Sequence, residues 1–178
     1  MPINTWSQNL NFIHAGTAGA AYASSTSLTD VSPAPQFTFA AYQLVPGSVI
    51  RVTAGGVASN TSTPTLLLGL YYGGVAGTAL AATTAITTTT AMTNWSWRLD
   101  YTGIVRTVGT SGTIMGMGQV RIPTSLTAWT YRPIPETALA TVTIDTTAAK
   151  TLTLGAQWSA NSGSNTLTCH QFLIESVA

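Results

Sequence analysis

The amino-acid sequence predicts an all-β fold, a β-sandwich built from about eight to ten antiparallel strands. Apolar and polar residues alternate with a period of two in many short runs, whereas no long window carries an apolar stripe at helical spacing. Threonine, with 33 of the 178 residues, and valine have branched Cβ atoms that pack well on pleated strands. For this number of strands without helices, the jelly roll is the commonest arrangement.

The alternating runs define the candidate strands in order along the chain. They lie near residues 36–42, 48–57, 65–72, 79–86, 94–108, 113–122, 127–132, 140–145, 150–158 and 165–176. Turns are expected at PGS 46–48, at the glycine pairs 55–56 and 73–74, at GTSG 109–112 and at NSGSN 161–165. The alternation is clearest in the strand at 150–158, where Leu152, Leu154, Ala156 and Trp158 share one face.

The first 35 residues are rich in alanine, serine and threonine and read as the least regular part of the chain. We therefore expect an extended or irregular N-terminal arm over residues 1–35 and one jelly-roll β-sandwich domain over residues 36–178. We expect the arm to be the part that reaches a neighbouring molecule.

Charged residues make up 6% of the chain, against about 25% in an average soluble domain. The single lysine and the five arginines are scattered, so the sequence predicts no binding of nucleic acid and no attraction to anionic membranes. A free monomer usually protects its sheet edges with charge, especially lysine. Because this chain has so little charge, we expect partner subunits, as copies of itself, to cover much of its surface.

Cys169 is the only cysteine, so no disulfide can form within the chain. The first residues, MPINTWSQNLNF, lack the basic start and apolar centre of a signal peptide. The most apolar stretch, residues 65–82, is interrupted by four glycines and is shorter than the ~20 residues of a membrane span. We therefore expect synthesis in a cytoplasm and no contact with a membrane.

Groups that could carry catalysis are few and dispersed. The two histidines are His14 and His170, and His170 follows Cys169 directly. Neighbours in a strand point to opposite faces, so this thiol cannot reach the adjacent imidazole. The five carboxylates are Asp30, Asp100, Glu136, Asp145 and Glu175, and no spacing typical of a metal site or a phosphate-binding loop occurs. We expect a protein that is not an enzyme and that holds no cofactor or metal.

The aromatic residues have two interpretations. In the strand at 94–108, Trp95, Trp97, Leu99 and Tyr101 share one face, and the opposite face is polar. We predict that these four, together with Trp129 and Trp158, fill the core or a subunit interface. The alternative is an exposed aromatic platform that stacks on sugar rings. The threonine run before this strand lacks proline, so it is not a mucin-like stalk but a strand or its flanking loop.

Several segments also resemble a known group of proteins. They are TPTLLLGLYYGGVAGTAL (63–80), NWSWRL (94–99), RTVGTSGTIMGMG (106–118) and LTLGAQWSANSGSNTLTCHQFLIE (152–175). In this order they resemble jelly-roll virion proteins of tailed bacteriophages, of the head-decoration or head-fibre type. The resemblance covers most of residues 45–178 and rests on structural motifs, so no functional residue is carried over.

The resemblance implies a structural role. Such proteins are often trimers, and decoration proteins among them bind the major capsid protein where capsomers meet. It implies a homotrimer on the outer capsid surface of a virion, made in the host cytoplasm, that stabilises the capsid lattice. The alternative function is a glycan-binding or receptor-binding module of a tail or head fibre, with a host glycan as its partner.

Overall fold

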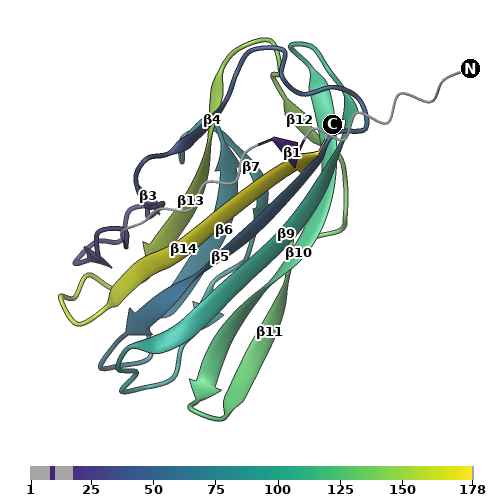
Figure 1. Ribbon diagram of the computed structural model, residues 1–178. Coiled ribbons are helices and arrows are strands. Elements are labelled where there is room, and N and C mark those ends of the chain that lie inside the picture. The colour runs from purple at the N-terminus through teal and green to yellow at the C-terminus, as the bar shows by residue number, and fades with distance from the viewer. Residues whose placement is uncertain (1–8, 11–17, 178) are drawn as a thin grey trace, which may run out of the picture.

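The computed structural model describes residues 9–10 and 18–177, which form strands and loops and contain no helix (Figure 1). The strands are β1 (Asn9–Leu10), β2 (Tyr22–Ala23), β3 (Thr29–Asp30), β4 (Phe37–Phe39), β5 (Val49–Ser59), β6 (Thr65–Tyr72), β7 (Thr78–Ala82), β8 (Ile86–Thr87), β9 (Trp95–Thr107), β10 (Gly112–Ser125), β11 (Ala128–Ile134), β12 (Val142–Ile144), β13 (Lys150–Trp158) and β14 (Thr166–Val177). In this described part, no helix is long and apolar enough to cross a membrane.

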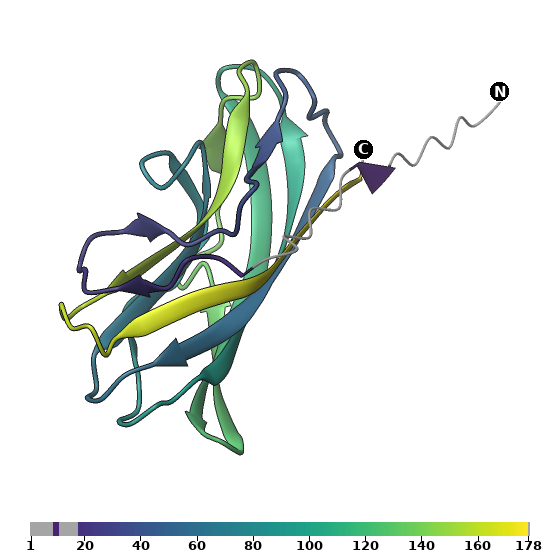
Figure 2. The same cartoon turned by 60° about the vertical axis from the view of Figure 1, so that its left-hand side comes forward.

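The strands form two antiparallel sheets that pack face to face, as the two views show (Figure 1, Figure 2). The larger sheet has the order β1-β14-β5-β9-β10-β11, with β2 beside β14 and β12 beside β10. The smaller sheet has the order β3-β13-β6-β7, with β4 beside β13 and β8 beside β6. The predicted all-β sandwich is therefore confirmed. We call the two layers the large sheet and the small sheet.

The pairing of the strands is nested, which is the winding of a jelly roll. β2 pairs with β14, β3 and β4 pair with β13, β5 pairs with β9, and β6 pairs with β7. Strands from the beginning of the chain thus pair with strands from its end, as in one long hairpin folded over two sheets. The strands β10, β11 and β12 follow β9 and extend the large sheet on one side.

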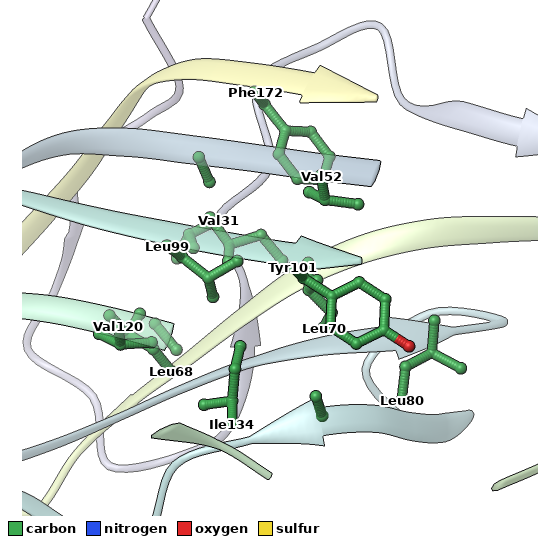
Figure 3. Close-up of a cluster of buried hydrophobic side chains, with 14 of the residues drawn as sticks. Val31, Val52, Leu68, Leu70, Leu80, Leu99, Tyr101, Val120, Ile134 and Phe172 are labelled. Carbon is green, nitrogen blue, oxygen red and sulfur yellow. The ribbon is translucent and has the colours of Figure 1, made fainter. Parts of the chain in front are cut away.

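The core lies between the sheets and consists mainly of side chains from their facing sides, joined by loop residues such as Val31, Leu44 and Met92 (Figure 3). In the figure, Val52, Leu99, Tyr101, Val120 and Phe172 of the large sheet point toward Leu68, Leu70 and Leu80 of the small sheet. The alternation along β9 explains this arrangement, because every second residue from Trp97 to Val105 is buried. Such burial of apolar area is the main stabilising contribution to the fold.

The described part of the N-terminal segment, residues 18–35, is built into the sandwich. Tyr22 and Val31 are buried in the same core, β2 pairs with β14, and β3 pairs with β13. The Tyr22 hydroxyl also donates to the carbonyl oxygens of Ser25 and Ser27, at 3.0 and 2.7 Å. These contacts hold the segment against its own domain. Apart from β1, the rest of the predicted arm lies outside the described residues.

Threonine hydroxyls interrupt one predicted strand. The run predicted at 79–86 is divided into β7 and β8 by residues 83–85. At the break, the buried Thr83 uses its side chain as well as its backbone: the Leu68 amide donates to Thr83 Oγ1 at 3.0 Å, and the Thr83 amide donates to the Leu68 carbonyl at 2.9 Å. A hydroxyl therefore takes a place that a backbone group would hold in a continuous ladder.

Candidate functional site

Most of the few charged side chains stand on the outward face of the large sheet. Six of the eleven (six basic plus five acidic) lie there, and they are Arg51, Arg98, Asp100, Arg106, Arg121 and Glu175. The face therefore carries just over half of the charged side chains of this chain. It is the surface on which a specific binding site can be sought.

Asp100 is the centre of a small network on this face. Both of its carboxylate oxygens accept from Arg98 Nε at 3.0 Å, and Thr53 Oγ1 donates to Oδ1 at 3.2 Å. Arg121 Nη2 lies 3.8 Å from Oδ2. Exposed ion pairs of this kind add little stability. They do orient Arg98, whose Nε is engaged while its two terminal nitrogens make no hydrogen bond within the described residues.

Two hollows flank this network, and Thr53 contributes to both. The first has a volume of about 520 Å³ and is bordered by Arg51, Asp100, Met117, Gln119, Leu139 and Glu175, among others. The second has a volume of about 380 Å³ and is lined by Thr53, Ala54, Gly55, Gly56, Val57, Ser96, Trp97, Arg98, Trp129, His170 and Gln171. Because two glycines form its floor, we call the second one the glycine hollow.

The glycine hollow exists because one row of side chains across the sheet has a gap. Gln171 on β14 lies opposite Gly55 on β5, and Gly55 lies opposite Arg98 on β9. The row thus has a long polar side chain at each side and none in the middle. The glycine pair 55–56 was expected to form a turn, and this prediction was wrong, because both residues lie inside β5. Here glycine leaves space instead of turning the chain.

A β-bulge in β14 shapes one wall of the hollow. Cys169 lies opposite Gly56 and Gln171 lies opposite Gly55, so His170 is the extra residue and has no partner in β5. As a result, His170 and Gln171 are both exposed, although they are neighbours in a strand. A Cβ atom at Gly56 would lie 1.9 Å from the Thr168 carbonyl oxygen. Glycine is therefore needed where β5 meets the bulge.

Cys169 and His170 face opposite sides of the large sheet. The Cys169 thiol is buried in the core, with Sγ 3.2 Å from the Gln171 carbonyl oxygen and 3.8 Å from that of Gly55. Burial raises the pKa of this thiol to about 12. The other histidine, His14, lies outside the described residues. Among the residues that the structure describes, no group of three or more His, Cys, Asp or Glu could hold a metal ion.

The structure separates the six aromatic and apolar residues that were predicted to fill the core or an interface. Trp97, Leu99, Tyr101 and Trp158 are buried in the core, and Trp95 packs against it while partly exposed. Trp129 differs: its side chain is 39% exposed and borders the glycine hollow on the outward face. The alternation along β11 misleads here, because Trp129, Tyr131 and Pro133 form its more apolar face and that face is the exposed one.

A second exposed apolar surface lies at one end of the sandwich, the upper end in Figure 1. It consists of Tyr42 and Val45 from the loop before β5 and Val108 from the turn after β9, and we call it the apolar end. Thr146 joins these loops: its carbonyl accepts from the Tyr42 amide at 2.8 Å, and its amide donates to the Gly109 carbonyl at 3.0 Å. The Gly47 amide donates to the Val105 carbonyl at 2.8 Å.

Comparisons of this chain with protein-family models, with curated proteins and with solved structures found no match.

Proposed function

We propose that this protein is a structural virion protein of a tailed bacteriophage, a head-decoration protein that binds the capsid lattice as a homotrimer. The proposal rests on the resemblance of its sequence segments to jelly-roll virion proteins and is supported by the sandwich fold and the scarcity of charge. Its work is done by surfaces that contact the major capsid protein and other copies of the chain, and it involves no catalytic step.

The observation that best supports this function is the apolar end. Tyr42 is 73% exposed and has a φ of 60°, a left-handed conformation that is uncommon for a residue other than glycine. The two loops that carry the exposed side chains, residues 40–48 and 107–112, contain no charged residue. Exposed apolar groups gathered in this way are typical of surfaces that bind another protein.

The loops of the apolar end are also held in place before any partner arrives. Besides the bonds through Thr146, the Val45 amide donates to Ser48 Oγ at 3.0 Å, and the Ala40 amide donates to Gln43 Oε1 at 2.8 Å. A preorganised surface loses less conformational entropy on binding than a mobile one. This end of the sandwich is therefore suited to a permanent contact with a capsid lattice.

The test measures assembly and head binding separately. Light scattering and native mass spectrometry of the purified protein should give the mass of a trimer. Capsids prepared without the protein should bind it, and Tyr42→Ser with Val108→Ser should weaken that binding by about tenfold or more at unchanged melting temperature. The matched control is Leu126→Ser, since Leu126 is equally exposed but lies in the turn at the other end of the sandwich.

A protein that stays monomeric and does not bind capsids that lack it would overturn the proposal. Equal capsid binding by the double variant and the wild type would remove the role of the apolar end.

A further inference from the structure

We propose that the glycine hollow on the large sheet is a binding site for one pyranose ring of a saccharide. The site lies on the outward face, toward the end of the sandwich where β11 begins, away from the apolar end (Figure 1). The inference goes beyond the proposed structural function and does not depend on how the protein assembles.

The size and position of the hollow favour a small ligand over a peptide that adds to the sheet as a strand. Its volume of about 380 Å³ is within the range of small-molecule sites. A peptide strand would need the unpaired backbone of a sheet edge. Here the floor is β5, which is paired with β14 on one side and with β9 on the other, so a ligand meets side chains.

Trp129 provides the apolar wall. It lies opposite Pro123 on β10, lines the hollow and is 39% exposed, so part of its side chain is accessible to a ligand. Ser96 and Gly55, which also line the hollow, are small and leave space in it for a ligand. The negative face of an aromatic ring attracts the polarised C–H groups of a sugar, so a pyranose can stack on Trp129.

The polar groups around the hollow match the hydroxyl groups of a sugar. The side chains of His170 and Gln171 make no hydrogen bond with any described residue, and the terminal nitrogens of Arg98 are likewise free. The Gln171 amide and a neutral imidazole can each donate and accept, whereas Arg98 only donates. A sugar hydroxyl also does both, so one ring can use all three side chains.

The charges around the hollow favour a neutral ring over an anion. The positive charge of Arg98 is already paired with Asp100 through two hydrogen bonds of 3.0 Å. Arg98 can therefore donate to a ligand hydroxyl without needing a negative partner there. The bound Asp100 also fixes the direction in which Arg98 points.

The experiment is saturation-transfer difference NMR of the soluble protein with glucose, galactose, mannose and N-acetylglucosamine, each as the free sugar and as the methyl glycoside. We expect at least one to bind with a dissociation constant of about 1–10 mM. Gly55→Thr should weaken binding by about tenfold or more, because the new side chain fills the gap between Gln171 and Arg98. A Cβ there would lie 3.3 Å from the Trp97 carbonyl oxygen, so the backbone must shift by a few tenths of an ångström, and β-branched threonine otherwise suits a strand.

Trp129→Ala should weaken binding to a similar extent. The matched control is Tyr131→Ala, because Tyr131 is an exposed aromatic residue on the same face of the same strand but does not line the hollow. Tyr131→Ala should bind like the wild type, and melting temperatures should establish that all three variants are folded. The proposal is overturned if none of the sugars binds, or if the Gly55 and Trp129 variants bind as well as the wild type.

Discussion

Tyr101 illustrates how single residues determine the packing of this sandwich. Its phenolic oxygen is buried and has no hydrogen-bond partner among the described residues, and burial raises its pKa. Two glycines leave the space for it: a Cβ atom would lie 2.6 Å from the Tyr101 oxygen at Gly103 and 2.1 Å from it at Gly116. These glycines lie inside strands and serve close packing, not a turn.

We predict that Gly116→Ala lowers the free energy of unfolding by about 1–3 kcal/mol, because the added methyl group overpacks the core against Tyr101. Urea titration followed by fluorescence measures the change. The control is Gly163→Ala, where a Cβ would meet nothing closer than 3.5 Å, so the expected change is within about 0.5 kcal/mol. Equal stability of the two variants would contradict the packing argument.

At the scale of elements, the segment between β11 and β12 joins the two sheets at one side of the sandwich. Glu136 in this segment is 8% exposed, pairs with Arg132 of β11, and accepts hydrogen bonds from the amide and the hydroxyl of Thr84, just after β7. Arg132 Nη2 also donates to Thr84 Oγ1 at 3.3 Å. This contact covers the side where β7 would otherwise present an unpaired edge.

We predict that acid weakens this contact. Burial alone would raise the pKa of Glu136, but the hydrogen bonds from Thr84 and Arg132 and the positive charge of Arg132 outweigh it, so the pKa is lowered from its ordinary value of 4.5. The unfolded chain therefore binds a proton more readily than the folded one. The stabilisation is present above about pH 4.5 and is lost as the pH falls through the lower folded pKa.

Glu136→Gln provides the measurement. Melting temperatures from pH 7 down to about pH 3 should show the variant less stable than the wild type at neutral pH, with the difference shrinking as the pH falls. Asp145 is a second carboxyl whose pKa is lowered, first of all by hydrogen bonds from Thr147. Both the variant and the wild type contain Asp145, so its titration does not contribute to the difference between them. A stability difference that does not depend on pH would contradict the role of the carboxylate.

At the scale of the whole molecule, the two surfaces with a proposed function lie at different places on one sandwich. The apolar end is formed by the loops before β5 and after β9, whereas the glycine hollow lies toward the hairpin of β10 and β11 (Figure 1). A molecule attached to a capsid by the first surface would leave the second surface accessible. The two proposals are therefore compatible, and each can fail without the other.

The nested topology predicts slow folding. The pair β2 and β14 joins the beginning and the end of the domain, and each inner pair except β6 and β7 is also distant in sequence. Such contacts require large loops to close before they contribute stability. Stopped-flow refolding should give a main phase in milliseconds to seconds. A main phase completed in microseconds would be inconsistent with this topology.

Local patterns along the chain are enough to predict the class of the fold and most of its strands. Alternation with a period of two is a local property of extended backbone, so β9, β13 and β14 could be located to within a few residues. The same alternation identified the buried side of β9. The pattern in β9 also grouped Trp97, Leu99 and Tyr101 correctly as residues of one face, all of which are buried in the core.

Which residues meet across the sheets could not be predicted from these local patterns. Gly55 and Gly56 are equally suited to a turn and to a gap in a sheet. The neighbouring strands decide between the two, because Gln171 and Arg98 lie beside Gly55 only after β14 and β9 have paired with β5. Trp129 is exposed because of where β11 joins the sheet. Pairing partners are chosen by contacts between segments far apart in the chain, whereas periodicity reports only on neighbours in sequence.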